Sequence, residues 1–207
     1  MLFWIDTDID FSRVDAGAGA LAAESARFTE LHGRRGLLRI WRKINGRGVH
    51  AVTDFATPEA LDDWLGALPT FNAMQAVEVT ALRPHKVFGD FGAWRERTGV
   101  AAGSLHFVRL AIDRARLESA RAAALTGAAE ANARRHVDHG QVVGIWRLPH
   151  GNGAHIAWHS HDHAELFHEL DTLPLKGYFR AVSAEPMLPF PGLEHLAGWA
   201  TNSGADE

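Results

Sequence analysis

The chain contains one long sequence pattern twice. Residues 40–84 align with residues 145–189 at a constant offset of 105, without a gap. The matched positions include Trp41 and Trp146, Arg42 and Arg147, Gly48 and Gly153, and His50 and His155. A repeat of this length indicates two fused domains of one kind, because solenoids are built from several shorter units.

Each copy carries the periodicity of a β-α-β-β-α-β unit. In the first copy the alternation of apolar residues predicts strands at about 2–10, 37–45, 48–55 and 75–82, with helices at 16–32 and 57–68. The second copy predicts strands at about 105–113, 141–148, 153–159 and 180–187, with helices at 115–136 and from 162. This is the ferredoxin-like order, in which two helices cover one face of a four-stranded antiparallel sheet.

The uncovered sheet faces suggest how the two copies associate. Trp4 and Phe107 are predicted to lie on these faces and are too apolar for water. We therefore expect an α+β fold in which two ferredoxin-like repeats form an intrachain α+β barrel, of the dimeric α/β-barrel type. The expected boundaries are repeat 1 at 1–88, a linker at 89–103, repeat 2 at 104–195 and a flexible tail at 196–207. A monomer or a homodimer is expected, because the sheets would already pair within one chain.

Composition narrows the possible functions. The 207 residues carry a formal net charge of −4 with both signs interspersed, so there is no basic stripe for nucleic acid. The absence of cysteine excludes disulfides, thiolate metal sites and cysteine nucleophiles. No stretch has the length and apolarity of a signal peptide or a membrane span. We expect a cytoplasmic protein that acts on a small molecule.

An ordered set of landmarks resembles the muconolactone isomerase family. The landmarks are Met1-Leu2-Phe3 at the start, a first helix with Glu24, the Trp41-Arg42 strand, a strand ending at Asp54, Leu68-Pro69, and V-x-V-x-x-L-x-P-H at 77–85. The resemblance covers residues 1–88 and, more loosely, 104–193. It implies a reaction that moves a proton between two carbons of an unsaturated lactone with no metal and no cofactor. The second copy departs from the pattern, with Ala129 in place of Glu24 and His159 in place of Asp54.

Three residues are candidates for acid-base catalysis. Glu24 falls between Leu21, Phe28 and Leu31 on the helix face that should pack on the sheet, where burial would raise its pKa. A base that takes and returns a proton benefits from such a shift. The alternative is an ion pair of Glu24 with Arg27 or Arg39. His50 and His155 could also serve as base or enolate donor, or could be structural in both sheets.

Eight further residues are candidates for substrate binding. Arginine can bind a carboxylate through two hydrogen bonds, and tryptophan can wall an apolar pocket. The candidates are Arg42, Arg147, Trp41, Trp146, Asp54, Trp4, Asp6 and Arg109. For the arginines and tryptophans the alternative is packing in or along the sheets. Asp6 and Arg109 occupy corresponding strand positions and could form either a salt bridge or a substrate contact.

The histidines between 155 and 168 invite a metal-site interpretation. His159, His161 and His163 alternate where a strand turns into a helix, but no ligand spacing such as H-E-x-x-H accompanies them. We expect solvated histidines and no metal. The favoured function is a cofactor-independent isomerase, or a cyclase or epimerase with the same chemistry. The alternatives are an α+β-barrel oxygenase, cofactor-free or haem-dependent, and a noncatalytic small-molecule binding protein.

Overall fold

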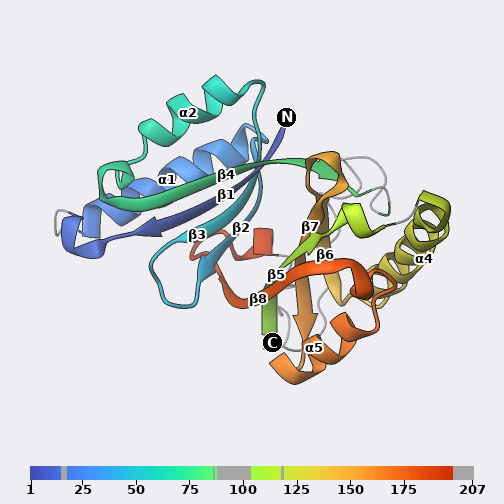
Figure 1. The fold of residues 1–207 in the computed structure, drawn as a ribbon. Coiled ribbons are helices and arrows are strands. Elements are labelled where there is room, and N and C mark those ends of the chain that lie inside the picture. Colours follow the sequence, from blue (N-terminus) through green and yellow to red (C-terminus); the bar gives the residue numbers. More distant parts are fainter. Residues whose placement is uncertain (15–17, 86, 88–103, 118, 198–207) are drawn as a thin grey trace. The chain divides into compact units, whose positions relative to one another are not determined.

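The computed structural model divides the chain into two compact units (Figure 1). It describes all residues except 15–17, 86, 88–103, 118 and 198–207. The first unit comprises Met1–Leu82 and Leu188–Glu207, and the second comprises Arg83–Met187. The predicted linker, 89–103, lies outside the described residues.

The first unit has the predicted order of elements. They are β1 (Leu2–Ile9), α1 (Ala18–Gly33), β2 (Leu37–Lys43), β3 (Val49–Asp54), α2 (Pro58–Gly66) and β4 (Met74–Pro84). The strands pair antiparallel in the order β4-β1-β3-β2. Thr57 caps α2 by accepting a hydrogen bond from the amide of Ala60, and Pro58 follows at the first helical position.

The second unit repeats this order. Its elements are β5 (Ser104–Ile112), α4 (Ser119–Asp138), β6 (Val142–Arg147), β7 (Gly153–Ser160), α5 (His163–Asp171) and β8 (Phe179–Pro189). The strands pair as β8-β5-β7-β6, again antiparallel. The first helix begins later than the predicted residue 115, because Asp113 caps a separate 3-10 turn at Arg114–Arg116.

The two copies share local features that the backbone requires. A Cβ on Gly48 would lie 1.8 Å from the carbonyl oxygen of Thr7, and one on Gly153 would lie 1.9 Å from that of Leu110. Only glycine permits this close approach of neighbouring strands. The ends of the first helix of each copy match too. The amide of Gly36 donates to the Leu31 carbonyl, and at the offset of 105 the amide of Gln141 donates to the His136 carbonyl. The offset of 105 therefore holds from the end of each first helix onward.

The core of the first unit lies between its helices and one face of its sheet (Figure 1). Phe28 of α1 is 2% exposed and contacts the rings of Trp64 and Phe190. Leu193 and Leu196 belong to the same core, beside a 3-10 turn at Glu194–Ala197. Sequence reasoning assigned Leu193 to the second repeat and Leu196 to a flexible tail. Both are instead buried in the first unit, because they complete its apolar core.

No helix in the described ranges is long and apolar enough to cross a membrane.

Candidate functional site

Glu24 is buried in the first unit, as its position on the helix predicted. It lies on α1 and is 4% exposed. Its carboxylate accepts a short hydrogen bond from the hydroxyl of Thr70, which is itself 1% exposed. Thr70 precedes the 3-10 turn at Phe71–Ala73, which leads from α2 into β4. The two side chains form a polar pair inside an otherwise apolar layer.

Burial raises the pKa of Glu24, and the hydrogen bond from Thr70 partly opposes this rise. Desolvation disfavours the charged form of a carboxyl group, whereas a donor to the carboxylate favours it. Desolvation is the larger influence here. Glu24 is thus shifted toward the range in which a carboxyl group can both accept and return a proton near neutral pH.

The ion pairs considered for Glu24 are not found among the described residues. Arg27 binds Glu30 at 3.1 Å. Arg39 is 2% exposed and donates to the carbonyl of Leu38 at 3.1 Å, and burial lowers its pKa to about 10. The partner of Glu24 is the uncharged Thr70 hydroxyl, so no neighbouring cation holds the carboxylate ionised.

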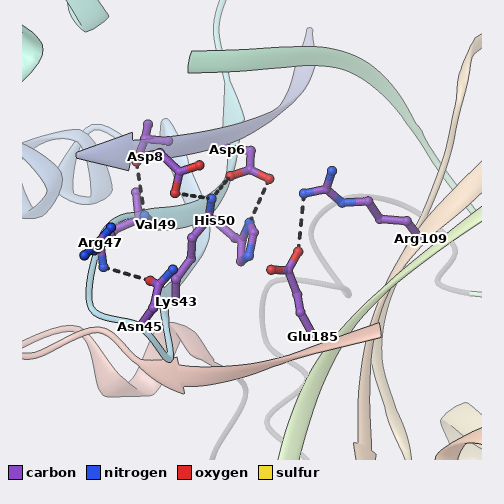
Figure 2. A network of polar contacts seen from close by, with 10 residues as sticks. Asp6, Asp8, Lys43, Asn45, Arg47, Val49, His50, Arg109 and Glu185 are labelled. Atoms are coloured by element: carbon purple, nitrogen blue, oxygen red, sulfur yellow. Dashed lines mark hydrogen bonds and ion pairs between the residues drawn. The ribbon is translucent and has the colours of Figure 1, made fainter. Parts of the chain in front are cut away.

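A second polar cluster lies in the same unit and contains Asp6, Lys43 and His50 (Figure 2). Lys43 Nζ lies 2.5 Å from Asp6 Oδ1 and 3.0 Å from Asp8 Oδ1, and His50 Nδ1 lies 3.5 Å from Asp6 Oδ2. Burial alone would lower the pKa of Lys43, but its hydrogen bonds to Asp6 and Asp8 raise it overall. Asp6 is therefore held between two basic side chains.

Strand register explains why the predicted residues gather here. Asp6 pairs with His50 across β1 and β3, and His50 pairs with Trp41 across β3 and β2. The ring of Trp4 stacks on Trp41 with centroids 5.8 Å apart and lies 5.5 Å from the ring of His50. Lys43 was not singled out from the sequence, although the alternation of β2 places it on the face of Trp41.

The sheet separates this cluster from Glu24. Val49 and Ala51 of β3 belong to the core that includes Phe28 of α1. His50 lies between them in sequence and therefore projects from the opposite face. Glu24 and His50 are thus not brought together, and one substrate carbon cannot lie within reach of both.

The corresponding face of the second unit has a different charge pattern. His155 pairs with Arg109 and with Trp146 in the strand register. Arg109 lies 3.4 Å from Glu185 (Figure 2). The guanidinium carbon of Arg109 lies 4.8 Å from the centroid of the Phe107 ring, which packs edge-to-face with the ring of His155 at a centroid distance of 5.1 Å. An arginine thus occupies the position that Asp6 has in the first copy.

Three other candidates lie apart from these clusters. Asp54 binds the amino group of Met1 at 2.8 Å at the end of β3. Arg42 is half-buried on β2, where it pairs in register with Val49. Arg147 is exposed at the end of β6 and lines a pocket of the second unit.

The histidine-rich segment divides into buried and exposed residues. His159 is fully buried, and burial together with the charge of His106 lowers its pKa to about 4. His106 Nδ1 lies 3.3 Å from the Ser160 hydroxyl, and burial lowers its pKa too. His161, His163 and His168 are exposed. Within the described part of this segment, no three potential ligands converge as a metal site requires.

The second unit holds a pocket of about 230 Å³ at the position equivalent to Glu24. Ala129 and Leu175 both line it, and they correspond to Glu24 and Thr70 at the offset of 105. Other lining residues are Ala133 and His136 of α4, Ile145 and Arg147 of β6, and Trp158 of β7. One copy therefore has a buried acid and its donor at this place, and the other copy has an apolar pocket.

Comparison with known proteins identifies the first copy. Residues 1–87 match the family model of muconolactone delta-isomerase. The first repeat belongs to the muconolactone delta-isomerase family. Within this domain Glu24 is the buried acid of the first helix, and Thr70 is its donor. None of the curated proteins compared with the chain matches it.

Solved structures resemble the whole chain in fold. A chlorite dismutase variant from Candidatus Nitrospira defluvii is 11% identical, covers 95% of each chain and gives a TM-score of 0.60. A haem-binding protein from Thermus thermophilus is 12% identical, covers 90% of this chain and 91% of its own, and gives a TM-score of 0.57. At these identities the likeness concerns the fold alone. It confirms the predicted fold class, α+β with two β-α-β-β-α-β halves of the dimeric α/β-barrel type.

Proposed function

We propose that the protein is a cofactor-independent isomerase that moves a proton between two carbons of an unsaturated lactone or a related enolisable small molecule. The observation that carries this proposal is Glu24, a buried acid whose pKa is raised and whose partner is an uncharged hydroxyl. Membership of residues 1–87 in the muconolactone delta-isomerase family supports the same chemistry.

In the proposed reaction Glu24 is the general base and then the general acid. Its carboxylate removes a proton from the saturated carbon at the far end of the conjugated C=C–C=O system, and the electron pair of the C–H bond passes into a dienolate. The carboxylic acid then gives the proton to another carbon of the dienolate, which moves the double bond and regenerates the carboxylate. Positioned acid-base groups of this kind contribute rate factors of about 10²–10⁴.

Thr70 is a positioning residue in this scheme. Its hydroxyl donates to the carboxylate of Glu24 and therefore fixes the orientation of one oxygen. Because this bond favours the ionised form, Thr70 also limits the rise of the pKa that burial causes.

The test compares two glutamates of the same helix. Glu24→Gln keeps the size of the side chain and its hydrogen-bond acceptor but cannot carry the proton. Glu30→Gln changes a half-exposed glutamate that binds Arg27 and serves as the matched control. With muconolactone as substrate, we expect Glu24→Gln to lower kcat by at least about 10² and Glu30→Gln to leave it near the wild-type value. Equal turnover by wild type and Glu24→Gln would remove Glu24 from the mechanism.

The two other functional classes predict different outcomes. A haem-dependent oxygenase would show the Soret band of protein-bound haem after titration with hemin. A cofactor-independent isomerase would not. A noncatalytic binding protein would bind the lactone without turning it over, and Glu24→Gln would then change only the affinity.

A further inference from the structure

We propose that the second unit binds a small ring-bearing carboxylic acid, without transforming it, in the pocket between α4 and the sheet. This inference concerns a different site from the one proposed for catalysis. It does not require that Glu24 be the catalytic base, because neither Glu24 nor Thr70 lines this pocket.

Substitutions between the repeats explain why the pocket exists. Phe28 fills the helix-sheet layer of the first unit, and the equivalent residue in the second unit is Ala133. A buried phenylalanine occupies space that an alanine leaves open. The wall also includes the apolar residues Leu110, Ile145 and Ile156, together with the polar residues Thr126, Asn132 and His136.

The shape of the pocket is maintained by contacts of its own wall. His136 Nδ1 lies 2.7 Å from Gln141 Oε1, and its ring lies 4.7 Å from that of Trp158. Arg114 donates to the carbonyl of His150 at 2.8 Å. These contacts fix the positions of His136 and Arg114 in the wall of the pocket.

The charges that line the pocket favour an anion. Arg114 and Arg147 are permanent cations, whereas Glu130 is the lining carboxylate. Within the described residues, no carboxylate lies at salt-bridge distance from Arg147, so its guanidinium can bind a ligand. A planar guanidinium forms two parallel hydrogen bonds with a carboxylate, which gives both affinity and orientation.

The volume limits the ligand to about one ring with a short side chain. A dry apolar cavity of about 150 Å³ in another protein holds benzene. A pocket of about 230 Å³ can therefore hold a six-membered ring and a chain of two or three atoms. Ala129 and Leu175 replace the acid and its donor, so this pocket lacks the acid-base pair of the first copy. Binding without turnover follows.

The experiment uses 3-phenylpropionate as the probe and 3-phenylpropanol as its uncharged control, with binding to the full chain measured by calorimetry. We expect one molecule of 3-phenylpropionate per chain. Ala133→Phe, which restores the residue type of the first repeat, should weaken binding at least tenfold. Ala129→Leu narrows the same pocket less severely and should weaken binding too, which guards against a folding defect in the first variant.

Arg147→Gln separates the carboxylate contact from the apolar contact. This variant should lower the affinity for 3-phenylpropionate about tenfold and leave the affinity for 3-phenylpropanol unchanged. Glu24→Gln should leave both affinities unchanged, which distinguishes this site from the catalytic proposal. Equal binding by wild type and Ala133→Phe would overturn the inference.

Discussion

Replacing Thr70 by valine should expose how strongly the structure depends on the buried pair with Glu24. Valine has nearly the shape of threonine but cannot donate to the carboxylate. Hydrogen bonds to charged groups stabilise proteins by about 1.5–3 kcal/mol, and the loss is larger where water cannot replace the donor. Thr70 is 1% exposed and Glu24 is 4% exposed, so we expect the upper half of this range at pH 8.

A double-mutant cycle isolates this energy. The free energy of unfolding in urea is measured for wild type, Thr70→Val, Glu24→Leu and the double variant, and the coupling is the departure from additivity. Leucine has no acceptor, so each single variant breaks the bond. At acid pH, where Glu24 is protonated, the coupling should fall to about 0.5–1.5 kcal/mol, the value for a neutral bond. The exposed Ser12 hydroxyl bonds Asp10 at 2.6 Å and provides a control pair of the same chemistry.

The control pair should show a much smaller coupling than Glu24 and Thr70, because water replaces the donor at an exposed site. Coupling between Glu24 and Thr70 that is no larger than that of Ser12 and Asp10 would refute the reasoning. The pair would then be a packing contact whose polar character contributes nothing, and Thr70 would lose its positioning role.

Three other perturbations have expected outcomes that unfolding measurements can check. Burial raises the pKa of Glu24 in the folded state above its value in the unfolded state. As the pH rises from the unfolded-state pKa through the folded-state pKa, the free energy of unfolding of wild type should therefore fall relative to that of Glu24→Gln. A constant difference between the two across this pH range would contradict the raised pKa. Burial lowers the pKa of His159 from 6.5 to about 4, so the unfolded chain takes up its proton first as the pH falls. The free energy of unfolding of wild type should therefore decrease by about 3 kcal/mol between pH 6.5 and pH 4, and His159→Gln should abolish this pH dependence. Lys43→Met removes the lysine from Asp6, whose side chain is 9% exposed, and should lower the free energy of unfolding by about 3–5 kcal/mol, part of which Asp6→Asn in the same chain should restore.

Most of the fold could be predicted from the sequence because the repeat presents every element twice. Period-two alternation predicted the first strand of each copy, and signals such as Gly36 and the Asn45-Gly46 turn predicted the hairpin that follows. Thr57 and Asp162 marked the starts of the second helices. The role of Leu193 and Leu196 could not be predicted from periodicity. They follow the last strand, and only three-dimensional packing shows that they complete the first core.

The candidate site was partly predictable. The position of Glu24 on the apolar stripe indicated its burial, but Thr70 lies in a turn, where no period assigns a side chain to the core. The repeat nevertheless contains a signal, since Glu24 and Thr70 change together to Ala129 and Leu175. Such a paired loss of acid and donor indicates contact. His50 was grouped with Glu24 because both are titratable, and strand alternation alone could have shown that they lie on opposite faces of the sheet.

Proton transfer to substrate carbon tests the central claim most directly. Muconolactone is incubated in D₂O with wild type, Glu24→Gln or Glu30→Gln, and deuterium at the ring carbons is followed by proton NMR. The account predicts that wild type and Glu30→Gln shift the double bond and that Glu24→Gln does so at least about 10² more slowly. The carbon that receives the proton should carry mainly the hydrogen that Glu24 removed, with deuterium entering only where the Glu24 acid exchanges with solvent first. Undiminished isomerisation by Glu24→Gln, or no reaction at any ring carbon with wild type, would contradict it.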